Sequence, residues 1–221
     1  MFPENVIIAG ATGLIGNQLV DLLTQQPGLK TLKLVNRREI EVSSPLIRQI
    51  IVDFDHLDDS KDLMSADLAF CCLGTTMKNA GSKEAFYRVD HDYILSFARK
   101  VHAAGVQRFF LISSMGADAG SSIYYNRVKG ETERDIRTIG FREVRFLRPS
   151  LLLGDRNETR TGESIGKFIM TTFGFLLAGP LKKYRAIHGR TVARAMVHLA
   201  GVPENGIFIH ESEQLQKLGG Q

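Results

Sequence analysis

Tyr125 and Lys129 are the residues of this sequence whose types and spacing best fit acid–base chemistry. On a helix, side chains four residues apart share a face, so the phenol and the ammonium would lie side by side. A neighbouring ammonium favours loss of a tyrosine proton, as proton donation near neutral pH requires. The pair predicts a tyrosine that gives a proton to a reacting oxygen, and a lysine that assists it and holds a ribose. The alternative is an exposed helical pair.

Two adjacent hydroxyls, Ser113 and Ser114, follow the apolar run Phe109–Ile112. A hydroxyl at the carboxyl end of such a strand, near the tyrosine, could hold a substrate carbonyl oxygen. Because successive strand residues point to opposite sides, one of the two serines is expected to be structural. We prefer Ser114 for the chemical role, and Ser113 remains a candidate.

A glycine pattern, Gly10, Gly13 and Gly16, joins the apolar run Val6–Ala9 to an amphipathic stretch that starts at Leu14. Residues without a Cβ let the backbone turn tightly and approach a pyrophosphate, whose charge the N-terminus of a helix attracts. The pattern therefore predicts a dinucleotide-binding loop. A plain strand–helix turn with packing glycines is the alternative.

The end of the second predicted strand carries Asn36, Arg37 and Arg38. An NAD site usually has an acidic residue here, about 20 residues beyond the glycines, for the ribose 2′-hydroxyl. This chain offers two guanidiniums instead, which suit a 2′-phosphate and predict NADP(H). The alternative is that both arginines are simply solvated.

Asp53 follows the third predicted strand and is expected to lie at the adenine edge of the cofactor. The acidic residues around it do not have the spacing of a metal-binding site.

Short apolar strands alternate with helical patterns, which predicts a parallel sheet covered on both faces, a doubly wound α/β fold in a single domain over residues 1–221. Ligands of such sheets bind beyond the carboxyl ends of the strands, where the motifs above lie. Residues 154–188 interrupt the alternation and are expected to form a lid or substrate segment. The expected strands are Val6–Ala9, Leu32–Val35, Ile50–Val52, Leu68–Leu73, Phe109–Ile112, Val144–Leu147 and Ile207–Ile209, and helices are expected over residues 14–23, 86–101 and 124–138.

Composition narrows the classes of protein. The 221 residues carry a net charge of +4 and are 43% hydrophobic, an ordinary globular balance that argues against disorder and gives little support for nucleic-acid binding. The only two cysteines, Cys71 and Cys72, are adjacent, so no disulfide is expected. No apolar run is long enough to span a bilayer, and the N-terminus does not resemble a signal peptide. We therefore expect a cytoplasmic protein, either monomer or homodimer.

Several stretches together resemble the short-chain dehydrogenase/reductase superfamily, and within it the atypical branch of Tat-interacting oxidoreductase-like proteins. The similarity covers nearly the whole chain. The stretches that carry it are Gly10–Gly13, Asn36–Arg38, Cys71–Thr76, Arg88–Asp90, Ser113–Asp118, Tyr125–Glu131, Leu147–Pro149 and Leu151–Arg160.

The resemblance implies a Rossmann-type fold that binds NADPH. Its phosphate loop would comprise Thr12, Gly13, Leu14 and Ile15, and its 2′-phosphate site Arg37 and Arg38. Leu73 and Gly74 would lie alongside the cofactor ribose, and Leu152 and Arg160 would make further cofactor contacts later in the chain. Tyr125 and Lys129 would be the catalytic pair.

The implied activity is hydride transfer from NADPH to a small-molecule carbonyl substrate, with Tyr125 as proton donor. An alternative is a non-catalytic NADP-binding redox sensor that acts through protein partners, although a sensor would have no need of Tyr125 and Lys129. Epimerase or dehydratase chemistry on bound NAD is disfavoured by Arg37 and Arg38 and by the short region that follows the sheet.

Overall fold

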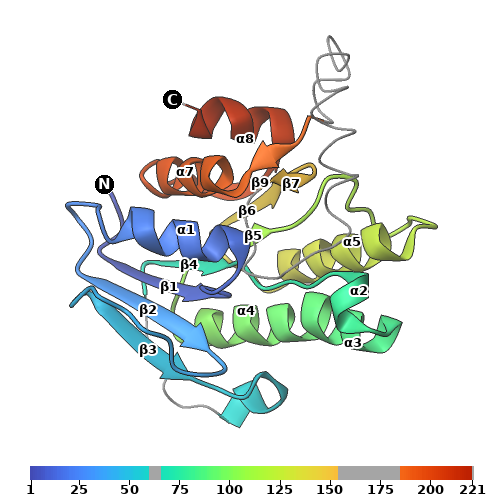
Figure 1. Cartoon of the computed structure of the whole chain (residues 1–221), viewed down its shortest axis with the longest axis horizontal. Helices are drawn as coiled ribbons and strands as arrows, with labels where there is room; N and C mark the ends of the chain where they lie inside the picture. Colours follow the sequence, from blue (N-terminus) through green and yellow to red (C-terminus); the bar gives the residue numbers. More distant parts are fainter. Residues whose placement is uncertain (60–65, 154–184, 221) are drawn as a thin grey trace.

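The structure, a computed structural model, describes residues 1–59, 66–153 and 185–220. Its centre is a parallel sheet of seven strands in the order β3-β2-β1-β4-β5-β6-β9, which confirms the predicted doubly wound α/β class (Figure 1). The strands of this sheet are β1 (Asn5–Ala9), β2 (Thr31–Asn36), β3 (Ile47–Ile51), β4 (Leu68–Cys71), β5 (Arg108–Ile112), β6 (Glu143–Arg148) and β9 (Gly206–Glu211). A second small sheet pairs β7 (Leu152–Leu153) with β8 (Ile187–His188).

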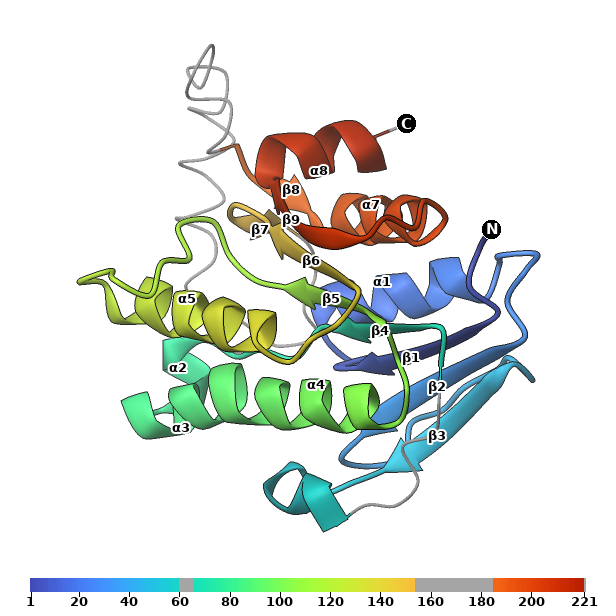
Figure 2. The ribbon, with the colours of Figure 1, turned by 180° about the vertical axis from the view of Figure 1, so that it is seen from behind.

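Helices cover both faces of the sheet (Figure 2). One face carries α1 (Leu14–Leu23), α7 (Gly189–Ala200) and α8 (Ser212–Gly219). The other carries α4 (Tyr93–Ala103) and α5 (Tyr124–Arg137), with the short helices α2 (Met77–Ala80) and α3 (Lys83–Tyr87) near the ends of α5 and α4. A 3-10 helix, η1 (Phe54–Asp59), follows β3, and a π-helical turn, η2 (Arg88–Asp92), joins α3 to α4.

The central strands β1, β4, β5 and β6 are buried on both sides, so their side chains contribute to two separate apolar cores. In β1, Val6 and Ile8 pack into the core under α1 and α7, while Ile7 and Ala9 pack into the core under α4. This double burial explains why the central strands read as continuous apolar runs rather than alternating ones.

The chain reverses its direction across the sheet between β1 and β4. From β1 it runs outward through β2 to β3, and then it returns to place β4 on the other side of β1. A crevice opens at the carboxyl ends of the two strands that flank such a switch point. Gly10 follows β1 and Cys72 follows β4, so both loops meet at this crevice.

The helix predicted over residues 86–101 is a continuous path of three segments, α3, η2 and α4. In the sequence Phe86, Val89, Tyr93, Phe97 and Val101 follow one another at helical spacing, but this apolar stripe shifts at the π-helical turn, because that turn holds one more residue than an α-helical turn. As a result Asp90 and Ile94 are fully buried, whereas Val89 and Tyr93 are half-buried. Of the expected lid segment over residues 154–188, residues 154–184 lie outside the described part of the chain.

Candidate cofactor and active site

Two glycines of the pattern are sterically required where β1 turns into α1. Gly10 has a φ of +86°, and a Cβ added to it would lie 2.5 Å from the carbonyl carbon of Cys72. A Cβ on Gly16 would collide with the carbonyl oxygen of Gly10. The glycines thus let the loop after β1 press against the loop after β4 and let α1 start directly above it.

The N-terminus of α1 is open to a ligand. Gly13 is its N-cap residue, so no side chain caps the helix, and its first turn contains no acidic residue. Thr12 and Gly13 are exposed, Leu14 is half-buried, and Ile15 belongs to the core below. Free N–H groups at the positive end of a ten-residue helix suit the phosphates of a dinucleotide.

A cavity of about 490 Å³ extends from this N-terminus across the carboxyl ends of β1, β2 and β4. It has the size of a small-molecule or cofactor site. Six residues predicted to contact the cofactor line this cavity: Gly10, Thr12, Gly13, Arg37, Leu73 and Gly74. The other residues that line it are Val35, Asn36, Phe54, Cys72, Thr75, Asn79, Ala80, Ala85, Val89 and Tyr93.

The two arginines that follow β2 differ in position. Both are exposed, and within the described residues neither makes an ion pair or a side-chain hydrogen bond. Arg37 lines the cavity, whereas Arg38 is not among its lining residues. An unpaired guanidinium at the cavity wall is suited to a phosphate, and the structure offers Arg37 for that contact more directly than Arg38.

Asp53, expected at the adenine edge, lies beside the cavity rather than on its wall. Its carboxylate accepts hydrogen bonds from the backbone N–H of Asp55, at 3.0 Å, and contacts His56 Nδ1, at 2.9 Å. The hydrogen bond from His56 holds the pKa of Asp53 below its ordinary value. The cavity wall at this end is formed by the rings of Phe54 and Tyr93, whose centroids lie 5.5 Å apart.

Tyr125 and Lys129 lie on α5, as the spacing predicted, but Lys129 is buried. Its Nζ lies 2.7 Å from Oδ1 of Asp90, a fully buried carboxylate of η2. Burial opposes the charge of Lys129, but the attraction of Asp90 and of Tyr125 outweighs burial, so the pKa of Lys129 lies above its ordinary value. A Cβ added to Gly74 would lie 3.6 Å from this Nζ, which places the ammonium directly behind the cavity wall.

The Tyr125 ring is half-buried and packs on Phe86 of α3, with ring centroids 5.4 Å apart. This contact fixes the ring from a neighbouring element. The adjacent Tyr124 also lies near Phe86, with ring centroids 6.1 Å apart, but its hydroxyl is already engaged, because it donates to the carbonyl oxygen of Lys83.

The two serines after β5 are in different environments. Ser113 is buried, and its hydroxyl donates to Oε1 of Glu133 at 2.5 Å. Glu133 in turn accepts two hydrogen bonds from Arg148, at 2.9 and 2.7 Å. Ser114 is half-buried, and among the described residues its hydroxyl makes only a long contact of 3.3 Å with the carbonyl oxygen of Met115. The hydroxyl of Ser114 is therefore the more available of the two.

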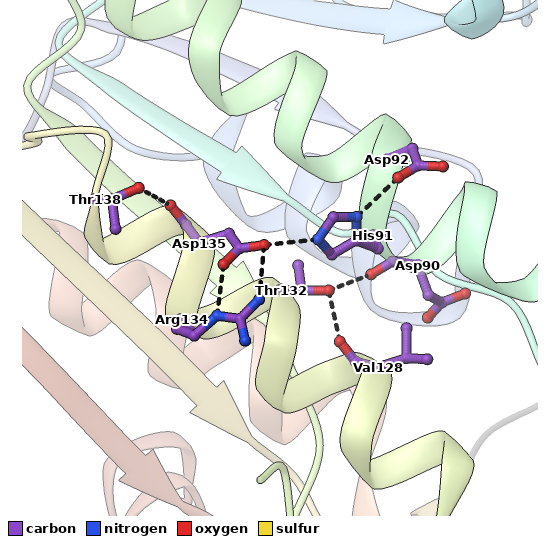
Figure 3. Close-up of polar contacts among 8 residues, drawn as sticks. All are labelled: Asp90, His91, Asp92, Val128, Thr132, Arg134, Asp135 and Thr138. Carbon is purple, nitrogen blue, oxygen red and sulfur yellow. Dashed lines mark hydrogen bonds and ion pairs between the residues drawn. The ribbon is translucent and has the colours of Figure 1, made fainter. Parts of the chain in front are cut away.

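Sequence reasoning missed the buried polar residues that hold α5 against η2 (Figure 3). Thr132 donates to the backbone carbonyl of Asp90 at 2.8 Å, and His91 bridges Asp92 and Asp135 at 2.8 and 3.0 Å. The sequence of α5 does contain a signal for these residues. Lys129, Thr132 and Glu133 share the helical stripe of Val128 and Ile136, so the core-facing side of α5 is half polar.

Leu152 and Arg160 were expected to make later cofactor contacts. Leu152 lies in β7, where it pairs with Ile187 and packs against the core under α1 and α7. Arg160 lies outside the described residues.

The fold and the cavity define a nucleotide-binding protein of Rossmann type. Residues 10–200 match the family model described as NAD(P)H-binding, and the chain belongs to this family. It is 37% identical to protein HTATIP2 of Rattus norvegicus over 224 residues, which cover 99% of this chain and 90% of the rat protein. It is 31% identical to protein fmp52, mitochondrial, of Emericella nidulans over 223 residues, which cover 98% and 95% of the two chains.

Solved structures share the fold at low sequence identity. The Bordetella bronchiseptica enzyme WbmH in complex with NAD⁺ matches with a TM-score of 0.70 and 15% identity, over 98% of this chain and 79% of that one. Human epimerase family protein SDR39U1 with NADPH matches with a TM-score of 0.62 and 18% identity, over 93% and 73%. The chain thus belongs to the NAD(P)H-binding family and is related to HTATIP2, which confirms the family resemblance predicted from the sequence motifs, and the solved structures show that it shares their fold.

The expectation of a cytoplasmic protein is wrong. It is contradicted by relatives from Emericella nidulans, Aspergillus fumigatus and Candida albicans, which all carry mitochondrial names. The expectation failed because unpaired cysteines indicate only that a fold needs no disulfide, and this does not separate one reducing compartment from another. Among the described helices, none has the length and apolar character of a membrane span.

Proposed function

We propose that the protein is an NADPH-dependent reductase that transfers hydride to a small-molecule carbonyl, with Tyr125 as proton donor. The observation that carries the proposal is the Lys129 ammonium, kept charged behind Gly74 at the cavity wall and one helical turn from Tyr125. A protein that only bound the dinucleotide would have no need of a phenol beside a buried cation.

The residues around the cavity fit the cofactor. The open N-terminus of α1 and the close approach allowed by Gly10 suit the pyrophosphate, while Arg37 suits a 2′-phosphate at the end of β2. Among fold neighbours, one structure holds NAD⁺ and another NADPH, so preference for NADPH rests on Arg37 and on the lack of an acidic residue at Asn36–Arg38. When bound, the reduced nicotinamide supplies a hydride to the carbonyl carbon.

The protein's own groups complete the reaction. Tyr125 donates its hydroxyl proton to the substrate oxygen as that oxygen gains negative charge. Lys129 stabilises the phenolate that remains, and Ser114 donates a hydrogen bond to the same substrate oxygen. Ser113 takes no part in this scheme, because its hydroxyl proton is committed to Glu133.

The test compares Tyr125→Phe with Tyr124→Phe, its neighbour on the same helix. Proton donation by a placed side chain is worth about 10²–10⁴ in rate, so Tyr125→Phe should lose that factor in NADPH oxidation with a panel of carbonyl compounds. Packing on Phe86 and NADPH affinity should be retained, since only the hydroxyl is removed. The Tyr124→Phe variant should catalyse reduction of the best substrate at the wild-type rate.

Two outcomes would overturn the proposal. If Tyr125→Phe retained full activity, the tyrosine would not be the proton donor. If wild-type protein bound NADPH tightly but turned over no carbonyl in the panel, a redox sensor that acts through protein partners would replace the reductase.

A further inference from the structure

Asp90 is a fully buried carboxylate to which the reaction scheme above gives no role. It lies in the π-helical turn η2, between two helices, and faces Lys129 across the interface with α5. An isolated charge in such a place is costly, so its retention calls for an explanation in terms of its contacts.

The two oxygens of the Asp90 carboxylate contact different elements. Oδ1 pairs with Lys129 Nζ at 2.7 Å, and Oδ2 accepts a hydrogen bond from the backbone N–H of Thr75 at 2.8 Å. Thr75 follows Gly74 in the loop after β4, and both residues line the cavity. One carboxylate therefore joins the lysine of α5 to the backbone of the cavity wall.

The π-helical turn explains how Asp90 reaches this position. Its wider turn leaves a backbone carbonyl available, and the carbonyl of Asp90 accepts a hydrogen bond from Thr132 Oγ1. The next residue, His91, is anchored by Asp92 on one side and by Asp135 of α5 on the other (Figure 3). The main chain of η2 and the side chain of His91 thus hold η2 against α5, which leaves the Asp90 carboxylate placed between Lys129 and the cavity loop.

We propose that Asp90 is a positioning residue, whose negative charge keeps Lys129 protonated and whose bond to Thr75 sets the cavity wall at the correct distance from that ammonium. The catalytic consequence rests on the proposed reductase function. In the part of the chain that the structure describes, the charged and titratable groups that face Lys129 are Asp90 from η2, Tyr125 from α5 and the Cys71 thiol from β4. Burial raises the pKa of the Cys71 thiol to about 12, so Asp90 is the group that supplies a full negative charge.

Asp90→Asn separates charge from shape. An asparagine oxygen can still accept the Thr75 N–H, but Lys129 would remain buried without a counter-charge, and burial favours its neutral form. Asp92→Asn is the matched control, because it removes a carboxylate from the same turn that pairs with His91 and not with Lys129.

The primary measurement is the pH dependence of the Lys129 Cε resonance in lysine-labelled protein, assigned by its loss in Lys129→Met. Wild type and Asp92→Asn should keep the position of a charged lysine between about pH 6 and about pH 9, below the range in which lysine ordinarily titrates. Asp90→Asn should move to the position of a neutral amine within that interval. A resonance that stays charged in Asp90→Asn would overturn the proposal.

Turnover and NADPH binding provide the second measurement. In Asp90→Asn, turnover should fall about tenfold or more near pH 8 and by less near pH 6, where Lys129 regains its proton. A loss that is equal at both pH values would indicate a structural role and would overturn the proposal. If wild type showed no turnover but the resonance behaved as expected, the reductase function would fail while the assignment of Asp90 would stand.

A double variant covers the case in which Asp90→Asn does not fold. Asp90→Asn combined with Lys129→Met removes both charges, so it should restore a cooperative unfolding transition if the unpaired ammonium caused the failure. A double variant that also fails to fold would overturn the proposal.

Discussion

At the carboxyl ends of β1 and β2 the N-terminus of α1 and the Arg37 side chain are left exposed, whereas at the carboxyl ends of β5, β6 and β9 polar side chains are paired around the buried carboxylate of Glu133. In the first region, α1 begins without a side-chain cap, and Arg37 has no ion pair among the described residues. In the second, Glu133 accepts from Ser113 and Arg148, and Arg148 also pairs with Glu211. We refer to these regions as the open half and the closed half.

The difference between the halves separates ligand binding from architecture. Groups that bind an anion must have free hydrogen-bonding capacity, which exposed groups keep at little cost. A buried charge cannot remain unpaired, so the closed half satisfies its charges internally. Lys129 and Asp90 lie at the boundary, since they are paired with each other but lie behind the wall of the open half.

The largest effect on stability is expected from breaking the closed half. Glu133→Gln removes a carboxylate that is nearly fully buried and leaves the Arg148 guanidinium short of its main partner. Removal of one member of a buried ion pair costs about 3–5 kcal/mol, and the remaining contact of Arg148 with Glu211 should keep the loss near the lower figure. Urea unfolding monitored by circular dichroism measures it.

Glu213→Gln is the control for this prediction. Glu213 pairs with Lys217 on the exposed face of α8 at 3.2 Å, and exposed pairs contribute about 0–1 kcal/mol. Equal losses in the two variants would show that the closed half has no special part in stability.

The sequence was sufficient to predict the open half and much of the fold. Apolar runs gave every strand of the main sheet to within a few residues, and the glycine spacing located the loop that Gly10 and Gly16 make possible. Both predictions depend on local chemistry: burial of a strand on both faces, and the absence of a Cβ at a tight turn.

The closed half and Asp90 could not be predicted in the same way. Their partners are distant in the chain, such as Ser113 with Glu133 and Asp90 with Lys129, and pairwise contacts of this kind leave no periodic pattern. Asp90 is further hidden by the π-helical turn, which shifts the phase of the apolar stripe and brings an acidic residue into the core. The strand order was also beyond reach, because apolar runs do not state which strand lies beside which.

A medium effect is expected from Arg37 in the open half. Loss of a guanidinium–phosphate contact should weaken NADPH binding by about 1.5–3 kcal/mol and leave NADH binding almost unchanged. Because Arg38 is not part of the cavity wall, Arg38→Ala should have a smaller effect than Arg37→Ala. Isothermal titration of both variants with both cofactors measures this. An equal loss of NADPH and NADH affinity in Arg37→Ala would remove the 2′-phosphate assignment, and with it the functional meaning of the open half.

The smallest effect concerns the pH dependence of the closed half. His210 of β9 lies beside Arg145, with Nε2 3.5 Å from a guanidinium nitrogen, and burial together with this cation lowers the pKa of His210 to about 4. In the unfolded chain histidine titrates near 6.5, so the unfolded state binds a proton first as the pH falls. The stability contribution of neutral His210 is therefore complete above about pH 6.5 and is lost as the pH falls towards about 4. Since the ring is partly exposed, we expect this contribution to be about 1–2 kcal/mol.

The measurement is the free energy of unfolding, determined with urea at pH 7 and at pH 4.5. Between these pH values the free energy of unfolding should fall less in His210→Asn than in wild type, while a variant of an exposed histidine, His198→Asn, should behave as wild type. If wild type and His210→Asn lost the same stability between these pH values, His210 would not be held neutral by its surroundings, and the closed half would not extend to β9.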